Sequence, residues 1–165
     1  MPPPVAAAAA FGISYREMTD ADLPFVAALY ATTRAREIAA TGWPPEMQAA
    51  FLEQQHRAQH ASYRRSYPDA EWLLIERGGE AIGRLYLARQ EDMLLLIDVS
   101  LLPTERGAGL GTAILTDLLA GETGAVQLHV ERTNAARRLY ARLGFEIVEE
   151  QAIYLRMVRP AAAKA

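Results

Sequence analysis

The sequence predicts a mixed α/β fold, in which four helices flank a mostly antiparallel sheet of six to seven strands. Two observations lead to this prediction. One strand-like and two helical segments come first, and three strand-like runs follow, with Gly78-Gly79 as a tight hairpin turn between the first pair. After these runs, helical and strand-like segments alternate to the end of the chain.

The first half of the chain supplies one strand and two long helices. Ile13 to Met18 is expected to form a short strand, and Asp22 to Ala39 a helix whose apolar residues are spaced for one face. Gly42 ends this helix. The pair Pro44-Pro45 suits a first helical turn, so a second, polar helix is expected over Glu46 to Arg65.

The second half supplies the rest of the sheet and two shorter helices. Strands are expected over Glu71 to Arg77, Ala81 to Arg89, Met93 to Leu102, Ala125 to Val130, Phe145 to Val148 and Ile153 to Val158. The helices are expected over Leu110 to Ala120 and Asn134 to Leu143. Residues 11–159 then form one domain, and the Pro- and Ala-rich ends, 1–10 and 160–165, are expected to be disordered tails.

Composition narrows the classes of function. The 165 residues contain 17 Lys and Arg against 20 Asp and Glu, a net charge of −3, so no overall basic surface attracts nucleic acid or anionic lipid. The absence of cysteine excludes disulfides, a cysteine nucleophile and thiolate metal sites. No apolar run reaches the roughly 18–20 residues of a membrane span, and the start lacks the features of a signal peptide. We therefore expect a cytoplasmic protein that binds neither nucleic acid nor membrane.

The run Arg106-Gly107-Ala108-Gly109-Leu110-Gly111 is the most informative local motif of the chain. It lies between an apolar strand and a helix. Because glycine has no Cβ, main-chain N–H groups can approach an anion closely, and the start of the helix adds its positive dipole end. The run therefore predicts a turn that binds a phosphate or a pyrophosphate.

Two other phosphate-binding motifs fit this run less well. A P-loop needs a lysine before its Ser or Thr, but Thr112 follows Gly111 directly. The spacing of Gly107, Gly109 and Thr112 nearly matches a dinucleotide-binding turn, with Glu131 at a strand end about 20 residues on. Dinucleotide folds usually open with such a unit, whereas here it follows the hairpin strands. A dinucleotide-dependent oxidoreductase is therefore a minor alternative.

A second motif, from Asn134 to Phe145, follows one strand later. With the glycine run it makes the chain resemble the GNAT superfamily of acyl-CoA-dependent N-acyltransferases. The matching residues are Arg106, Gly109 and Gly111 in the first motif and Asn134, Arg137, Leu139, Tyr140, Gly144 and Phe145 in the second. Ala136 lies one position away from the family pattern. The order of elements also matches, so the resemblance covers roughly Ile13 to Val158.

The resemblance implies an acetyl-CoA-dependent N-acetyltransferase, in which a primary amine of a small molecule or peptide attacks the thioester directly in a ternary complex. It implies that the glycine run binds the pyrophosphate of coenzyme A and that the end of the preceding strand pairs with the pantetheine arm. The N–H of Leu101 or Leu102 would face the thioester oxygen. The residues expected to bind acetyl-CoA are Ser100, Leu101, Leu102, Arg106, Gly107, Ala108, Gly109, Leu110, Gly111, Thr112, Asn134, Arg137 and Tyr140.

Two side chains are candidates for proton transfer. Tyr140 is the expected acid, because a phenol with an ordinary pKa near 10 is protonated at pH 7 and can donate to the departing thiolate. Asp98 is the one charged residue in an apolar strand, where partial burial would raise its pKa toward that of a base for the ammonium substrate. A packing role for Tyr140 and an arginine partner for Asp98 stay open, and a water can also carry the proton.

The resemblance implies that the two early helices form one wall of the acceptor site, with Trp43, Gln54, Gln55 and Tyr63 as candidate contacts. The second helix is richer in Gln, Arg and Tyr than in carboxylates, which favours a small amine or amino-acid-like acceptor with some anionic character. Glu37, Glu46 and Glu53 speak against this preference, because their carboxylates could hold an amine. The alternative to an enzyme is a non-catalytic domain that binds acyl-CoA as a sensor or docking module. A homodimer through the last strands is compatible with the sequence.

No metal site is predicted. His56 and His60 are four residues apart on one helix face, but they lack a third ligand and the intervening Glu of a metalloprotease motif. Both histidines are expected to be solvated.

Overall fold

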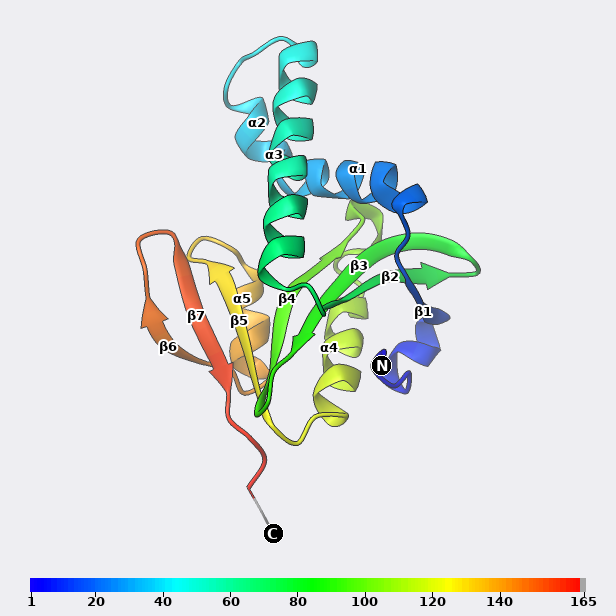
Figure 1. Cartoon of the computed structure of the whole chain (residues 1–165), viewed down its shortest axis with the longest axis vertical. Helices are drawn as coiled ribbons and strands as arrows, with labels where there is room; N and C mark the ends of the chain where they lie inside the picture. The colour runs from blue at the N-terminus through cyan, green and yellow to red at the C-terminus, as the bar shows by residue number, and fades with distance from the viewer. Residues whose placement is uncertain (164–165) are drawn as a thin grey trace.

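The computed structural model describes residues 1–163 and contains a seven-stranded sheet with the order β1-β2-β3-β4-β5-β7-β6 (Figure 1). Neighbouring strands pair antiparallel except β4 and β5, which are parallel. The structure thus confirms the mixed α/β fold and the mostly antiparallel sheet. The strands are β1 (Ile13–Glu17), β2 (Glu71–Arg77), β3 (Glu80–Arg89), β4 (Met93–Leu101), β5 (Ala125–Glu131), β6 (Glu146–Glu150) and β7 (Tyr154–Arg159).

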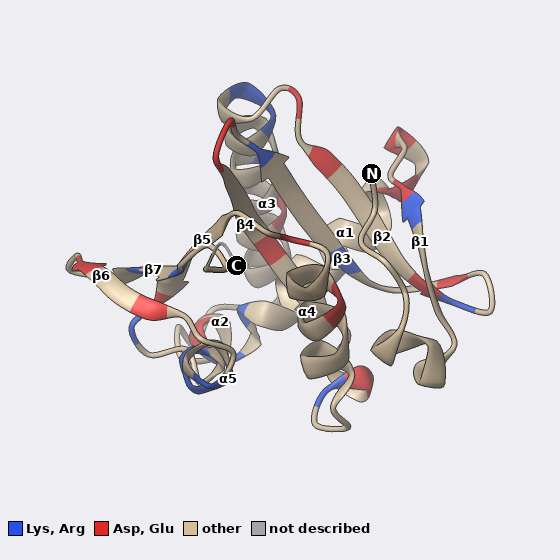
Figure 2. Cartoon of the chain, turned by 90° about the horizontal axis from the view of Figure 1, so that it is seen from below, with Lys and Arg blue, Asp and Glu red and all other residues tan. Residues whose placement is uncertain are grey.

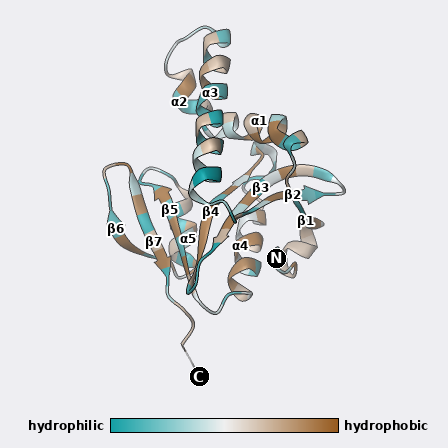
Figure 3. Ribbon diagram, in the orientation of Figure 1, coloured by the Kyte–Doolittle hydropathy of each residue, from teal (hydrophilic) through white to brown (hydrophobic). Residues whose placement is uncertain are grey.

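The described α-helices cover both faces of the sheet. They are α1 (Leu23–Thr33), α2 (Ala35–Ala39), α3 (Pro45–Ser66), α4 (Leu110–Ala120) and α5 (Ala136–Arg142). Because neighbouring residues of a strand point to opposite faces, β2 contributes side chains to two hydrophobic cores, one on each face of the sheet. Leu73 and Ile75 pack in the core shared with α4 and α5, whereas Trp72 and Leu74 pack in a smaller core with α1. Figure 3 shows hydrophobic colours along the central strands and α4, while α3 is largely hydrophilic and extends beyond the sheet.

The first long helix expected from the sequence is divided in two at Arg34. The hydroxyls of Thr32 and Thr33 donate to the carbonyls of Leu29 and Tyr30, at 2.7 Å in each case. Threonine side chains that bond back to the preceding turn compete with the helical hydrogen bonds. Arg34 then leaves the helical conformation, so the described chain has five α-helices rather than four.

The N-terminal segment is docked on the domain, which corrects the expectation of a disordered tail over residues 1–10. Ala7–Phe11 form a 3₁₀ turn that contacts α4. The buried carboxylate of Asp117 accepts the backbone N–H groups of Ala6, Ala7 and Ala8 at 2.7–3.1 Å. No local pattern reveals this contact, because its acceptor lies more than 100 residues along the chain.

The C-terminal end has less structure. Residues 160–163 form neither helix nor strand, although the Ala162 N–H donates to the Thr123 carbonyl at 3.1 Å. The rest of the expected tail, residues 164–165, lies outside the described residues. Within residues 1–163, no helix is long and apolar enough to cross a membrane.

Asp117→Ala is expected to lower the free energy of unfolding by about 1.5–3 kcal/mol, since one hydrogen bond to a charged group contributes about that much and three N–H groups lose their acceptor. Burial raises the pKa of Asp117, but the N–H groups of Ala8, Ala7 and Ala6 outweigh burial and hold it below its usual value. The contribution of Asp117 is therefore complete above about pH 4 and is lost as the pH falls through the lowered pKa.

Urea unfolding at pH 7 and at pH 3 measures this effect, with Asp69→Ala at an exposed position as the matched control. The difference between wild type and Asp117→Ala is expected to shrink at pH 3. An unchanged stability at pH 7 would contradict the anchoring role.

Candidate functional site

β4 and β5 separate partway along the sheet, and this separation is the main opening at the centre of the fold. The strands pair over Met93 to Leu96 and Ala125 to Leu128. Beyond these residues, within the described chain, β4 pairs with β3 alone and β5 with β7 alone. A register shift opposite Tyr86-Leu87 makes Ile97 an extra, bulged residue where the strands part.

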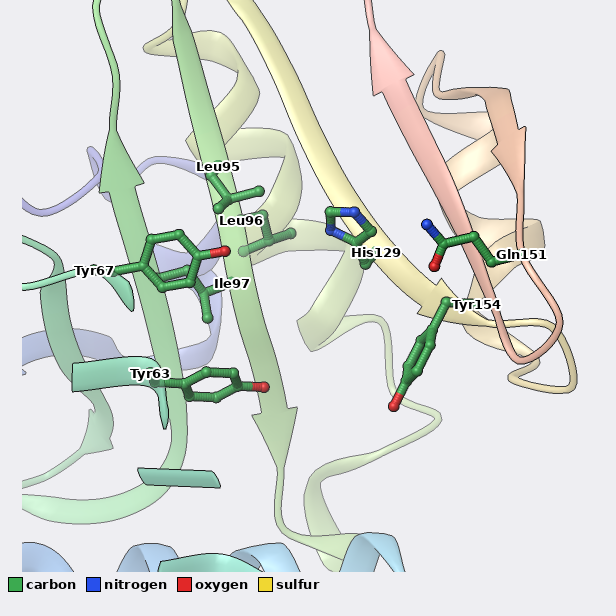
Figure 4. A pocket seen from close by; sticks show the side chains of 8 residues that line it. All are labelled: Tyr63, Tyr67, Leu95, Leu96, Ile97, His129, Gln151 and Tyr154. Atoms are coloured by element: carbon green, nitrogen blue, oxygen red, sulfur yellow. The ribbon is translucent and has the colours of Figure 1, made fainter. Parts of the chain in front are cut away.

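A cleft of about 280 Å³ lies at this separation. Figure 4 shows side chains from four parts of the chain around it: β4, β5, the end of α3 and the β6–β7 hairpin. The lining residues are Tyr63, Tyr67, Leu95, Leu96, Ile97, His129, Gln151 and Tyr154. The cleft therefore joins segments from both halves of the sequence at one sheet opening.

Beyond the bulge, every second main-chain N–H group of β4 points toward the opening. Leu102 donates its N–H to the Ile82 carbonyl at 2.9 Å, so this N–H belongs to the ladder with β3. Because bonded and non-bonded pairs alternate along an antiparallel ladder, the N–H groups of Val99 and Leu101 point away from β3. Of the two residues named from the sequence, Leu101 has its N–H directed to the opening, whereas that of Leu102 is already used.

The glycine run forms a turn with unpaired donors at the start of α4. Gly107 and Gly109 have φ angles of 81° and 88°, in the left-handed region that favours glycine. Gly109 is the N-cap of α4. Within residues 1–163, the main-chain N–H groups of 107–112 donate to no protein acceptor. Six consecutive free donors at a positive helix end are the arrangement that binds a phosphate anion.

Gly111 and Arg106 contribute differently from Gly107 and Gly109. Gly111 has no positive φ, and a Cβ there would make only an ordinary contact with Leu101 at 3.9 Å. The Arg106 guanidinium donates through Nε to the Leu101 carbonyl at 3.0 Å and through Nη2 to the Thr32 hydroxyl at 3.3 Å. Arg106 thus links the glycine turn to the end of β4 and to α1.

Tyr140 lies in α5 and is almost completely buried. Its ring packs edge-on against Phe145, with 5.8 Å between the ring centroids, and it is 8 % exposed. Burial raises the pKa of Tyr140 to about 12, and the negative charge of Asp98 adds to the rise. The hydroxyl is therefore protonated at pH 7. The fold brings Tyr140 and Asp98, from α5 and β4, within electrostatic reach of each other.

Asp98 is held in a polar network at the edge of the cleft. Its Oδ2 accepts a hydrogen bond from Arg84 Nε at 2.5 Å, and Ser100 Oγ donates to the same carboxylate at 3.2 Å. Arg84 is 2 % exposed and donates through Nη2 to Gln59 Oε1 at 3.0 Å. The Asp98 carboxylate is therefore already engaged by Arg84 and Ser100, the kind of arginine partner that the sequence left open for it.

The residues of the second motif have structural contacts of their own. Asn134 Oδ1 accepts the N–H of Ala136 at 2.9 Å, and the helix begins at Ala136 rather than at Asn134. Arg137 donates to the Arg132 carbonyl. Glu131, the ribose contact in the dinucleotide hypothesis, pairs with Arg34 at 2.8 Å. That pairing engages one carboxylate oxygen of the residue on which the minor alternative depends.

The four candidate acceptor contacts are not brought together. Tyr63 lines the cleft, whereas Trp43 and Gln55 line a separate groove of about 290 Å³ between α1, α2 and α3. Gln54 is exposed and lines neither space. The division follows from the length of α3, whose first half lies beside α1 and α2 and whose end lies beside the sheet (Figure 1).

Three residues of the site were not predicted from the sequence: Arg84, Tyr154 and Val99. A charged residue inside the apolar run from Ala81 to Ala88 was a usable signal for Arg84, since buried arginines are paired. Tyr154 had no comparable signal. Its place at the cleft depends on the β6–β7 hairpin packing next to β5.

His56 is buried, which corrects the expectation that it is solvated. It is 5 % exposed, lies 5.7 Å from the Tyr30 ring, and its Nε2 has no partner within the described residues. Burial, followed by the charges of Arg84 and His60, lowers the pKa of His56 to about 4. The imidazole is therefore neutral at pH 7 and belongs to the interior between α1 and α3.

Solved structures with the same fold are numerous. The PaiA N-acetyltransferase from Thermoplasma acidophilum, solved in complex with coenzyme A, is 16 % identical with a TM-score of 0.65, over 90 % of this chain and 98 % of that one. A histone acetyltransferase HPA2-related acetyltransferase from Corynebacterium glutamicum is 20 % identical with a TM-score of 0.66, over 93 % and 98 % of the two chains. An acetyltransferase from Thermus thermophilus is 19 % identical with a TM-score of 0.64, over 90 % and 96 %.

At these identities the solved structures establish a shared fold. Comparison with curated proteins gives no match. The family model described as "Acetyltransferase (GNAT) family" matches residues 32–145, which is more than half of the chain and includes both motifs, the β4–β5 separation and Tyr140. The chain therefore belongs to the GNAT acetyltransferase family.

Proposed function

We propose that this protein is an acetyl-CoA-dependent N-acetyltransferase that acetylates a primary amine by direct attack in a ternary complex. The observation that carries the proposal is the row of unpaired N–H groups at residues 107–112, placed beside the open edge of β4. Family membership supports the same conclusion. The coenzyme A bound to the PaiA protein of Thermoplasma acidophilum, which shares the fold, supports the choice of cofactor.

The described residues fit coenzyme A. The turn with Gly107 and Gly109 in left-handed conformations suits a pyrophosphate, and the N–H groups of Val99 and Leu101 offer strand-like pairing to an amide-rich pantetheine arm. When bound, acetyl-CoA supplies the thioester carbon at which the amine nitrogen replaces sulfur, so one C–N bond forms as one C–S bond breaks. We assign the N–H of Leu101 to the thioester oxygen, since the N–H of Leu102 is bonded to Ile82.

The proton roles are assigned to Tyr140 and Asp98, which lie within electrostatic reach of each other. Tyr140, kept protonated by its raised pKa, donates to the leaving thiolate and can recover a proton from the acceptor nitrogen. Asp98, paired with Arg84, attracts the ammonium form of the acceptor toward the cleft. Before it attacks the thioester, the ammonium group of the acceptor loses its first proton to Asp98 or to a water that Asp98 orients. The structure thus favours an electrostatic part for Asp98 alongside the base role expected from the sequence.

The cofactor assignment predicts a thermal shift. Acetyl-CoA at 100 times its Kd is expected to add about 2.7 kcal/mol of stability, which raises the Tm by about 5–11 °C for a domain of this size. Gly109→Ala strains a left-handed position in the turn and is expected to abolish most of the shift.

Gly42→Ala is the matched control, because Gly42 has a φ of 67° with open space around its Cβ position and lies outside the turn. It is expected to keep the full shift. A wild-type protein whose Tm does not respond to acetyl-CoA would refute the cofactor assignment.

The acid assignment predicts that Tyr140→Phe lowers kcat by about 100-fold or more while the Kd for acetyl-CoA stays within about twofold. Because the pKa of Tyr140 is about 12, the wild-type rate is expected to show no loss from this group up to about pH 10. Thiol release from acetyl-CoA measures both effects.

Tyr15→Phe is the control for this prediction, since it removes another buried hydroxyl at a distance from the cleft. It is expected to keep the wild-type rate. Full activity of Tyr140→Phe would contradict the acid role, and a wild type that binds acetyl-CoA but acylates no amine would establish the non-catalytic binder instead.

A further inference from the structure

The cleft at the β4–β5 separation offers aromatic rings and hydroxyls, and within the described chain His129 is its one lining side chain that can carry a charge near neutral pH. None of its eight lining residues is acidic, lysine or arginine. Three of them are tyrosines on opposite sides: Tyr63 and Tyr67 from the end of α3, and Tyr154 from β7 (Figure 4). Leu95 and Ile97 add apolar surface from β4. Such walls suit a flat, apolar body better than a chain of charged groups.

Tyr63 and Tyr154 form facing walls of the cleft and differ in their surroundings. Burial, followed by the negative charge of Asp98, raises the pKa of Tyr63 above its ordinary value. Its ring is braced edge-on by Tyr86, with 6.4 Å between the centroids. Tyr154 is 41 % exposed, so its ring forms an accessible wall at the entrance. One wall of the cleft is therefore rigid and the opposite wall is open to an arriving ligand.

The charged residues around the cleft favour an acceptor with a single cationic group. Asp98 acts on the hydroxyls of both Tyr63 and Tyr140, and it is compensated by the buried Arg84. Figure 2 shows further acidic residues along β6, the outer strand of the β6–β7 hairpin. Of these, Glu149 is engaged by Arg156 at 3.0 Å and by Gln151 at 3.1 Å. Glu149 is therefore already paired, and no acidic side chain among the described residues lines the cleft to hold a second ammonium group.

An acceptor that carries its own carboxylate is also disfavoured. Its negative charge would approach Asp98, and the nearest buried cation, Arg84, already serves Asp98 and Gln59. No lysine or arginine of the described chain lines the cleft, so His129 is the one lining side chain able to carry a positive charge, and desolvating a carboxylate without a cationic partner is costly. The structure thus argues against the anionic acceptor favoured by the composition of α3.

We infer that the acceptor is a small primary monoamine on an uncharged aromatic ring, of the arylalkylamine class. The ring lies between the Tyr63–Tyr67 wall and Tyr154, and the amine points toward Asp98 and Tyr140. The cleft volume of about 280 Å³ suits a molecule of this size. This inference rests on the proposed acetyltransferase function and specifies its acceptor.

Steady-state acetylation of four amines tests the class. 2-Phenylethylamine has the ring and one cation, butylamine lacks the ring, phenylalanine adds a carboxylate, and spermidine adds cations. The kcat/KM for 2-phenylethylamine is expected to exceed that for each of the others by about tenfold or more, since losing an aromatic contact or burying an unpaired charge costs at least that factor. Equal or better use of any of the other three would overturn the inference.

Variants of Tyr154 test the place of the ring. Tyr154→Leu is expected to raise KM for 2-phenylethylamine by about tenfold with little change for butylamine, whereas Tyr154→Phe is expected to keep most of the preference. The partly exposed position makes both variants compatible with folding. Equal effects of Tyr154→Leu on the two amines would contradict the assigned ring contact.

Direct binding separates this inference from the proposed function. Calorimetric titration of 2-phenylethylamine and of spermidine into the protein, with and without coenzyme A, is expected to show tighter binding of 2-phenylethylamine. This preference without any acetylation would support the acceptor class while the proposed function fails. Acetylation of spermidine together with tighter binding of spermidine would support the proposed function while the acceptor class fails.

Discussion

The parting of β4 and β5 is the constraint on which the rest of this structure depends. Neighbouring parallel strands normally satisfy each other's backbone groups, and each buried group left without a partner costs free energy. Here the two strands stop pairing after Leu96 and Leu128, and each continues with an antiparallel partner on its outer side. The inner edge of β4 is left with unused N–H groups, and the bulge at Ile97 marks where this edge begins. A ligand with its own amide groups can complete the edge.

Hydrogen bonds in the interior around this opening hold two charged side chains, Arg84 and Asp98, in fixed positions. Arg84 is buried in β3, where an unpaired guanidinium would be strongly destabilising. Asp98 and Gln59 satisfy it, and Ser100 adds a further hydrogen bond to the carboxylate. A buried ion pair is weak evidence for stability by itself, but it fixes the position of the Asp98 carboxylate next to the cleft-lining Ile97. Tyr140, in contrast, is kept neutral by burial.

The sequence predicted those features that depend on local patterns. The boundaries of β2 and α4 agree with the expected ones, because hairpin glycines and a helix start are encoded within a few residues. The glycine turn and α5 were found for the same reason. The long-range features were not predictable in this way: Asp117 binds a segment about 110 residues away, and Arg84 meets its partners across β4 and α3. At the break before Arg34, the Thr33 hydroxyl competes with the helical N–H groups for carbonyl acceptors. The two kinds of hydrogen bond are similar in strength, so the sequence does not show which one forms.

Amide hydrogen exchange, with and without coenzyme A, tests most directly whether the β4 edge and the glycine turn form one cofactor site. The N–H groups of Val99, Leu101 and residues 107–112 are unpaired within the described chain and are expected to gain protection together on binding. The N–H of Leu102 is already bonded to Ile82 and serves as an internal reference with little expected change. Protection confined to other segments, with residues 99, 101 and 107–112 still exchanging freely, would contradict this account of the site.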